Sequence, residues 1–370
     1  MPETTVFAAR SVITMDHEHP DATAVAVSGG RIIAVGALED LRGSGVIDDT
    51  FAGAVLVPGL IDQHLHPILG AGALITEIIA VEDWVLPERT FAAARTPEEY
   101  RRRLAEAEQR IADPGEWLIS WGYHKLWHGD LDRAALDAIS ATRPIVVWQR
   151  SCHEWYLNTA AITALGLTAE QMAGKGPASE MVDFAGGHWW EAGMNLLLPA
   201  VAPVVLSPER LAAGLRQLVG YLHANGVTAI NEPGIMWDTE PWDLYQQILG
   251  AAETPFSSTF LVDARSQAAS GMDPADAVAD AEAQVARAAS GKVRLLPKQV
   301  KLFADGAIIS QLMQMRDPYL DDAGNPDLCH HGEWMMQPDV FRAFAKAYWD
   351  ADWQLHIHVN GDAALDLVLD

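Results

Sequence analysis

Short apolar runs and amphipathic stretches alternate along the second half of the chain, in a pattern typical of an α/β protein. Four runs are apolar almost throughout and predict buried parallel strands: residues 226–233, 256–264, 300–306 and 355–362. Stretches with helical periodicity separate them, at residues 243–252, 275–290 and 338–351. Strands and helices in alternation predict βα units and a parallel sheet.

The N-terminal part has a different pattern. Residues 1–57 contain short β-prone runs and predict a small β-sandwich module. Gly29 and Gly30 separate two of these runs and predict a two-residue hairpin, in which both central positions need positive φ. The apolar run at residues 54–62 then predicts the first strand of the parallel sheet.

Residues 72–215 interrupt the strand–helix rhythm. Within them, Thr96 is placed to cap a helix, with Glu99 at the capping-box position. This segment is rich in tryptophan, at Trp84, Trp117, Trp121, Trp127, Trp148, Trp155, Trp189 and Trp190. We interpret it as an insertion, or lid, after the first strand, so that the parallel-sheet domain comprises residues 58–71 and 216–370.

The composition narrows the classes of partner. The chain contains 50 Asp and Glu residues and 25 Lys and Arg residues, which gives a formal net charge of −25. This charge disfavours binding to nucleic acid and to anionic membrane surfaces. The two cysteines, Cys152 and Cys329, support neither a disulfide framework nor a cysteine zinc site. The first residues lack the pattern of a signal peptide, and the chain has no apolar run of membrane-spanning length. We expect a cytoplasmic protein with a small-molecule partner, and leave a homodimer open.

The strongest chemical signal is the pair His64 and His66 at the end of the first apolar strand. Residues two apart in an extended chain point to the same side, so both imidazoles can meet at one point. Imidazole is a good ligand for zinc and related divalent metals. The alternative is two histidines that end a strand and face solvent, and the apolar run before them favours the ligand pair.

Three motifs together resemble a known family. Residues 57–67 (VPGLIDQHLHP) are similar to the first-strand motif of the amidohydrolase superfamily. Residues 300–310 (VKLFADGAIIS) and 356–370 (HIHVNGDAALDLVLD) resemble its amidohydrolase-3 branch, which includes N-substituted formamide deformylases. The resemblance extends over essentially the whole chain. It implies a TIM-type (β/α)8 barrel, incomplete in this sequence, and metal-dependent hydrolysis of a non-peptide carbon–nitrogen bond.

The resemblance also implies a ligand set. His64 and His66 match the first-strand ligands, and His358 matches the fifth-strand ligand. Lys301 matches a fourth-strand lysine that carbon dioxide carbamylates, so that it bridges two divalent ions, for which zinc is expected. The residue itself fits this role, because a buried lysine loses its charge and only the neutral amine adds carbon dioxide. The alternatives for Lys301 are an ion pair with Asp305 or a lysine that extends to the barrel end.

Further candidates lie near these ligands. His356 is expected behind His358, supporting it or packing in the core, and Asn360 is expected to line the pocket. Asp305, four residues after Lys301, is a candidate to bind the substrate or to support the metal ligands. Asp362 supports a metal-bound histidine or the substrate, or else caps a loop.

The insertion supplies weaker candidates. His153 resembles the family's pocket histidine, with packing at a helix start as the alternative. His124 and His128 are spaced for one helical face, but flanking glycines favour a pocket loop over a second metal site. Trp121 is a candidate for an apolar substrate pocket, although such tryptophans mostly pack in a core. Glu232, at a strand end, is either a pocket acid or a structural hydrogen-bond partner.

One catalytic group stays unassigned. The family continues with a sixth-strand histidine and an eighth-strand aspartate that shuttles the proton, whereas this sequence stops at Asp370. We expect a piece of a longer protein, and a catalytic carboxylate beyond its last residue. The expected substrate is small and partly apolar, with an N-formyl or other amide bond. The alternatives are an esterase, lactonase or deaminase using the same site, or an inactive barrel that binds a ligand.

Overall fold

The computed structural model describes residues 3–235, 242–288, 290–308, 311–321 and 323–370. Residues 289, 309 and 310, which belong to the predicted helix 275–290 and the motif 300–310, lie outside the described residues. The chain divides into two compact units, Met1–Ile61 and Asp62–Asp370. Each unit is described by itself.

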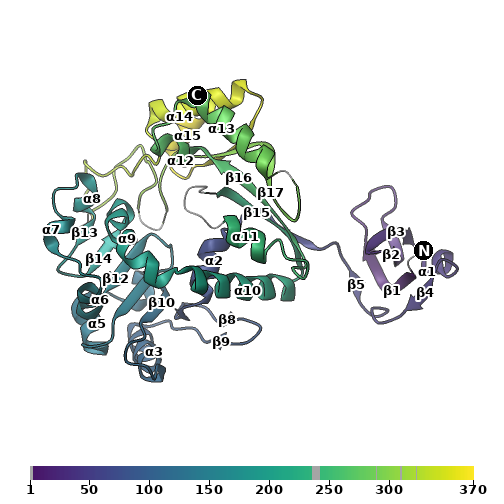
Figure 1. Ribbon diagram of the computed structural model, residues 1–370, viewed down its shortest axis with the longest axis horizontal. Coiled ribbons are helices and arrows are strands. Elements are labelled where there is room, and N and C mark those ends of the chain that lie inside the picture. Colours follow the sequence, from purple (N-terminus) through teal and green to yellow (C-terminus); the bar gives the residue numbers. More distant parts are fainter. Residues whose placement is uncertain (1–2, 236–241, 289, 309–310, 322) are drawn as a thin grey trace. The chain divides into compact units, whose positions relative to one another are not determined.

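The first unit is built on one sheet (Figure 1). Its elements are β1 (Thr4–Ile13), β2 (Asp21–Ser28), β3 (Arg31–Gly36), α1 (Leu38–Leu41), β4 (Val46–Asp48) and β5 (Val55–Leu56). The strand order is β3-β2-β1-β4, with β5 also paired to β1. Gly29 and Gly30 have φ of 57° and 74°, which confirms the predicted hairpin between β2 and β3. The expected sandwich stays a prediction.

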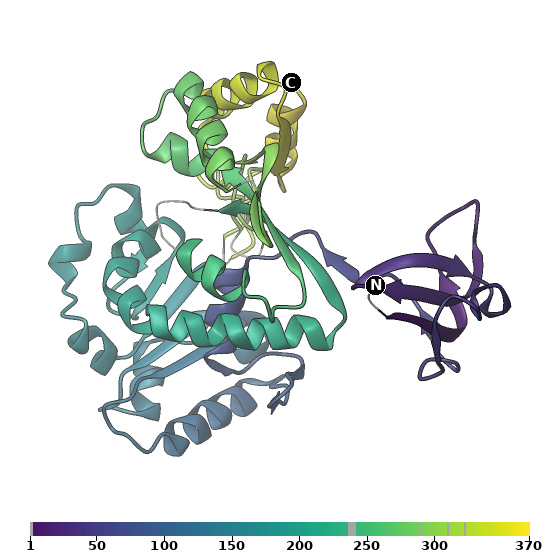
Figure 2. The ribbon, with the colours of Figure 1, turned by 45° about the vertical axis from the view of Figure 1, so that its right-hand side comes forward.

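The second unit contains a curled parallel sheet, a half-barrel whose long strands are seen most clearly in Figure 2. Its strands are β6 (Leu60–Asp62), β15 (Val227–Ile235), β16 (Ser257–Asp263), β17 (Val293–Phe303) and β18 (Gln354–His358). The order is β18-β17-β16-β15-β6, and β15 to β18 pair in parallel. The predicted strands are therefore confirmed, with β17 beginning earlier than expected.

Helices connect and cover these strands. They are α11 (Trp242–Ile248), α12 (Ala264–Ala269), α13 (Pro274–Arg287), α14 (Pro338–Asp350) and α15 (Asp362–Leu369). Three of them match the predicted amphipathic stretches. Phe260, Val300 and Leu302 of the sheet are fully buried in a core that includes Phe341 and Phe344 of α14. Burial on both faces explains why these strands read as continuous apolar runs.

The single first strand predicted over residues 54–62 is wrong. The structure breaks it into β5, which pairs with β1, and β6, which lies next to β15 in the half-barrel. Pro58 and Gly59 fall between the two pieces. Proline has no N–H for a sheet ladder, so the apolar run cannot continue as one strand.

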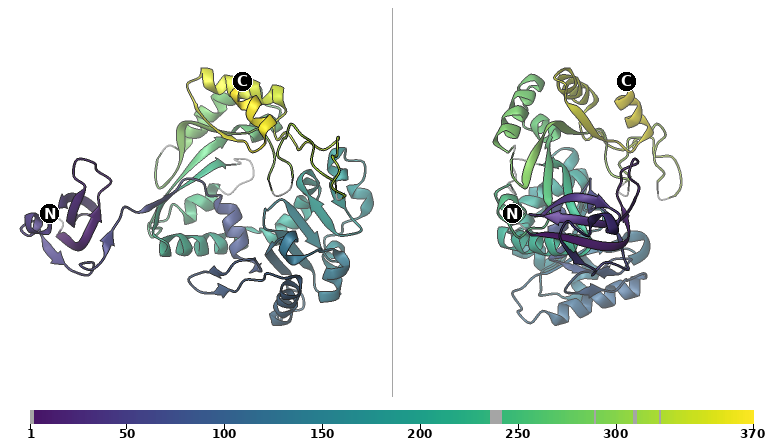
Figure 3. Two further views of the ribbon diagram at one scale, coloured as in Figure 1. Left: turned by 180° about the vertical axis from the view of Figure 1, so that it is seen from behind. Right: turned by 90° about the vertical axis from the view of Figure 1, so that its right-hand side faces the viewer.

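The insertion forms a mixed sheet with helices around it, seen from behind in Figure 3. The strands of this sheet are β7 (Glu77–Ile78), β10 (Leu118–Tyr123), β11 (Ile145–Gln149), β12 (Glu154–Leu157), β13 (Val182–Asp183) and β14 (His188–Trp190). A separate two-stranded sheet is formed by β8 (Trp84–Val85) and β9 (Thr90–Phe91). The helices of the insertion are α3 (Pro97–Arg110), α4 (Lys125–His128), α5 (Arg133–Ile139), α6 (Thr159–Ala164), α7 (Ala169–Met172), α8 (Pro177–Glu180), η1 (Glu191–Gly193) and α9 (Met194–Val205). Two helices, α2 (Pro67–Leu74) and α10 (Pro208–Ala224), cross its two boundaries with the half-barrel domain.

The order of the mixed sheet is β13-β14-β12-β11-β10-β7. It is parallel from β7 to β11 and antiparallel from β11 to β13. Thr96 caps α3 by accepting from the backbone N–H of Glu99 at 3.2 Å, as the sequence predicts. In the described part of the chain, no single helix is long and apolar enough to cross a membrane, although the stretches Glu191–Val205 and Pro208–Ala224 pass together as a pair bent by 76°.

Candidate active site

The half-barrel strands bring imidazole and lysine side chains together at their C-terminal ends. His64 and His66 follow β6, while Lys301 on β17 is the parallel partner of His356 on β18. The His64 ring centre lies 5.2 Å from that of His66 and 5.6 Å from that of His356. The chain therefore gathers its predicted first-strand histidines beside the lysine strand and one histidine of the fifth.

Lys301 is almost fully buried, with 1% of its surface exposed. Burial lowers the pKa of its ammonium to about 8, although the carboxylates of Asp263 and Glu232 oppose the shift. The alternative of an ion pair with Asp305 is wrong, because that carboxylate accepts hydrogen bonds from backbone N–H groups instead. Nor does any described carboxylate lie within salt-bridge distance of the lysine Nζ, which is 4.8 Å from the ring centre of Phe303.

Gly234 makes room for this lysine. A Cβ at position 234 would lie 3.0 Å from Cγ of Lys301, and the glycine has φ of +125°. Both the close approach and the backbone conformation require glycine here.

His66 is oriented by a buried carboxylate. Its Nδ1 lies 2.6 Å from Oε1 of Glu232. Glu232 is a residue of β15 and is 4% exposed. Burial raises the pKa of Glu232, while the hydrogen bond from His66 opposes that shift. When Nδ1 donates to the carboxylate, the lone pair of Nε2 is left for a ligand. Glu232 makes the predicted structural hydrogen bond and also lines the cavity described below, so its role as a pocket acid stays a prediction.

The surroundings of His64 and His356 disfavour the protonated forms of these two histidines. Burial lowers the pKa of His64 to about 4, and His66, Lys301 and His356 add to the effect through charge repulsion. Burial and Lys301 also lower the pKa of His356. Neutral imidazoles and a readily deprotonated amine form a donor set whose chemistry fits a divalent metal. Among the described residues, no three His, Cys, Asp or Glu side chains already form a group that could hold a metal ion.

A cavity of about 530 Å³ opens beside this cluster. The half-barrel and its connections contribute His66, Ile68, Leu69, Glu232, Gly234, Tyr245, Arg265, Phe303, Asp305, Gly306, Ala307, Met335 and His358. The insertion contributes Ser151, Cys152, His153 and Met194. Apolar walls with a few convergent polar groups are typical of a small-molecule site.

His358 lines this cavity, but His356 is the one whose ring lies against His64. Nε2 of His358 is 2.8 Å from Nδ2 of Asn360, and its ring stacks on Phe303. Burial lowers the pKa of His358. Asn360 also donates to the carbonyl of Gly306, so its side chain holds the end of β18.

Asp305 and Asp362 hold the segment between β17 and β18. The fully buried carboxylate of Asp305 accepts the backbone N–H groups of Gln314, Asn360 and Gly361 at 2.9, 2.9 and 2.7 Å. Asp362 accepts the backbone N–H of Arg316 at 2.9 Å, which fits the loop-capping alternative. Only Asp305 of the two lines the cavity.

Trp121 and His124 are not among the residues that line this cavity, although the Trp121 side chain interacts with the thiol of Cys152, which does line it. Trp121 is buried, and its ring centre lies 5.1 Å from that of Trp84. His124 precedes α4, and its backbone N–H donates to Nδ1 of His128. His128 is itself buried, stacked on Tyr100, and bonds to the carbonyl of Ala94.

Sequence reasoning missed Glu191, Arg265 and the two cavity methionines. Glu191 forms a buried pair with His153 from 38 residues away, so local spacing gave no signal. Arg265 is the second residue of α12, which follows β16, and its guanidinium lies 4.3 Å above the ring of Phe303. Its place at the C-terminal end of a parallel strand was a usable signal.

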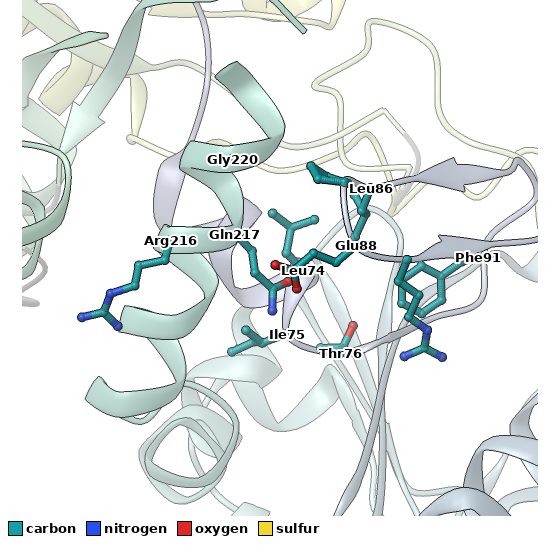
Figure 4. Close-up of a pocket in the computed structure, with 11 residues that line it drawn as sticks. Leu74, Ile75, Thr76, Leu86, Glu88, Phe91, Arg216, Gln217 and Gly220 are labelled. Carbon is teal, nitrogen blue, oxygen red and sulfur yellow. The ribbon is translucent and has the colours of Figure 1, made fainter. Parts of the chain in front are cut away.

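A second cavity, of about 430 Å³, has different walls (Figure 4). It lies between the end of α2, the β8–β9 turn and α10, and is lined by Leu74, Ile75, Thr76, Leu86, Pro87, Glu88, Arg89, Phe91, Arg216, Gln217 and Gly220. No histidine or cysteine is among these residues. The histidines His66, His153 and His358 line the first cavity instead.

The strand order and the curl of the sheet define a parallel half-barrel, with His64, His66 and Lys301 at or just after the C-terminal ends of its strands. Residues 51–370 match the family described as the Amidohydrolase family, and the chain belongs to that family. A solved structure with a similar fold is an uncharacterized metal-dependent hydrolase from Pyrococcus horikoshii. It has a TM-score of 0.65 and 19% sequence identity over 99% of this chain and 67% of that one.

Two curated relatives share 26% identity with 97% of this chain. They are the Protein LONG AFTER FAR-RED 3 of Arabidopsis thaliana, of which 59% is covered, and an N-substituted formamide deformylase of Arthrobacter pascens, of which 64% is covered. The chain thus spans about three fifths of the length of these relatives.

Proposed function

We propose that this protein hydrolyses a non-peptide carbon–nitrogen bond, such as an N-formyl amide, in a small and partly apolar substrate. The observation that carries the proposal is the cluster of His64, His66, Lys301 and His356 beside the 530 Å³ cavity. The name of the Arthrobacter relative, an N-substituted formamide deformylase, supports the choice of an N-substituted formamide.

In the proposal, His64, His66, Lys301 and His358 hold one or two divalent ions, with zinc as the expected metal. His356 is close enough to His64 to be a further ligand. A bound ion of this kind lowers the pKa of water to about 7 and polarises a carbonyl. Glu232 fixes the ring of His66, and Phe303, Met194 and Met335 keep the cavity wall apolar.

Lys301 suits carbamylation. With a pKa of about 8, about a tenth of its amine is neutral at pH 7, and the neutral amine is the form that adds carbon dioxide. A carboxyl mass on Lys301 under non-denaturing conditions is the expected result. A lysine that stays unmodified in the metal-loaded, active protein would remove this part of the proposal.

The test combines metal content with turnover. We expect zinc to bind the protein and formate to be released from N-phenylformamide, with both lost in His66→Ala. His223→Ala is the matched control, because His223 is an exposed histidine at the end of α10. Release of formate from phenyl formate, but not from N-phenylformamide, would favour the esterase alternative. A protein that binds no metal and turns over neither would favour a ligand-binding barrel.

A further inference from the structure

The second cavity lies apart from the proposed metal donors, and its walls belong to one compact unit. The C-terminal end of α2, the β8–β9 turn and α10 surround about 430 Å³ (Figure 4). That volume is in the range of small-molecule sites, which are usually preformed. No proposed metal donor is among the lining residues, so the proposed hydrolysis does not explain this cavity.

Contacts within the unit hold the walls of this cavity in place. Helices α2 and α10 meet at backbone distance, because a Cβ at position 214 of α10 would meet the carbonyl of Ala71 in α2. The backbone N–H of Leu86 donates to the carbonyl of Arg89 at 2.9 Å, which closes the β8–β9 turn. The guanidinium of Arg89 then donates to Glu77 of β7 at 2.7 Å. The cavity is therefore preformed and needs no ligand to open it.

Part of the lining is apolar. Leu74 and Phe91 are 6% and 4% exposed, and Leu86 is half-buried. Ile75 and Pro87 add further apolar surface. Side chains of this kind can cover the hydrocarbon part of a ligand, and removal of apolar area from water favours its binding.

The polar part of the lining has one charge that is left without a partner. In the described part of the chain, no hydrogen bond or ion pair engages the carboxylate of Glu88 or the side-chain amide of Gln217. The charge of Arg89 is instead neutralised by Glu77. In Figure 4, the side chains of Glu88 and Gln217 point toward one another, while that of Arg216 points away from both.

These groups favour a cationic ligand over an anionic one. The Glu88 carboxylate and the side-chain oxygen of Gln217 both accept hydrogen bonds, and a primary ammonium ion has three N–H groups to donate. The formal net charge of −25 also favours the approach of cations to the protein. An anion in the same place would meet the Glu88 carboxylate and be repelled.

We propose that the second cavity binds a small primary ammonium ion with a compact apolar body, such as benzylammonium. The ammonium group donates to the carboxylate of Glu88 and to the side-chain oxygen of Gln217. The apolar body lies against Leu74, Leu86 and Phe91. Because none of the proposed metal donors takes part, the site does not depend on the proposed function.

Calorimetric titration with benzylammonium tests the charge requirement. One equivalent should bind to wild type, benzyl alcohol of nearly the same shape should bind about fivefold more weakly, and benzoate more weakly still. Glu88→Gln should weaken benzylammonium binding by about fivefold, the effect typical of an ion pair at an exposed site, and added salt should reduce the difference. Glu209→Gln is the matched control, because Glu209 is also exposed but lies on α10 outside the lining.

Gly220→Leu tests the position of the site without a change of charge. Gly220 belongs to the lining, and open space surrounds the point where its Cβ would lie. Leucine favours a helix more than glycine does, so this variant should fold, and its thermal midpoint checks that it does. Since the leucine side chain fills part of the cavity, benzylammonium should bind at least about tenfold more weakly.

His66→Ala separates this site from the first cavity, which His66 lines. Its affinity for benzylammonium should stay within a factor of about two of the wild-type value, as expected for a distant and independent site. Absence of binding to wild type, equal affinity for benzylammonium and benzyl alcohol, or unchanged affinity in either Glu88→Gln or Gly220→Leu would overturn the proposal. Loss of binding in His66→Ala would place the amine in the first cavity and overturn it as well.

Discussion

Replacing Asp305 with asparagine should destabilise the junction between β17 and β18 strongly. Asparagine keeps the shape of the side chain but has only one acceptor oxygen. If that oxygen takes the place of Oδ2, the bonds from Gln314 and Gly361 survive without charge assistance and the bond from Asn360 is lost. A charge-assisted hydrogen bond contributes about 2 kcal/mol and a neutral one about 1 kcal/mol. The sum is a loss of about 4 kcal/mol.

Native-state amide hydrogen exchange measures this loss where it occurs. A cost of about 4 kcal/mol corresponds to about 10³-fold less protection at the three donor amides. Asp321→Asn is the control, because Asp321 also accepts backbone N–H groups, from Ala323 and Asn325, but is exposed. If Asp305→Asn changed exchange no more than Asp321→Asn does, burial of the charge would not be the source of the effect.

Three further outcomes are expected. Gly234→Ala should lower zinc binding without unfolding the protein, because its Cβ would displace Lys301; unchanged zinc stoichiometry by elemental analysis would contradict this. Burial raises the pKa of the Cys152 thiol to about 11, so iodoacetamide at pH 8 should modify the exposed Cys329 first, and labelling of Cys152 should rise about tenfold per pH unit up to its pKa. Equal labelling rates by mass spectrometry would refute it. A chelator should abolish hydrolysis and added zinc restore it; activity that persists after verified metal loss would exclude the metal-assisted route.

Periodicity and spacing were enough to predict the parallel strands, their helices and the first histidine pair. These features depend on residues two to four apart, and burial on both faces leaves a clear signal in the sequence. Pro58 is a signal in the sequence for a break in the first strand, but the apolar residues on both sides of it favour a single strand over residues 54–62. The sandwich form of the N-terminal module, the domain limits and the cytoplasmic location stay predictions.

The rest of the site depends on contacts that local patterns do not encode. His153 meets Glu191, and His66 meets Glu232, only because the fold brings distant segments together. In the sequence, Asp305 is a candidate ion-pair partner for Lys301. In the structure, its carboxylate instead accepts hydrogen bonds from the backbone N–H groups of Gln314, Asn360 and Gly361, which come later in the chain. The close approach of His356 to His64 likewise depends on the curl of the sheet.

The walls of the first cavity come from both the half-barrel and the insertion. Evolutionary changes on the half-barrel side and on the insertion side therefore affect different properties. The half-barrel carries the metal donors, while the insertion contributes Ser151, Cys152, His153 and Met194 near the point where its sheet turns from parallel to antiparallel. Under the proposed function, substitutions on the insertion side can change which substrates are accepted while the proposed metal donors stay intact. Paralogues that diverge in the insertion and keep the half-barrel would therefore retain the reaction and differ in substrate specificity.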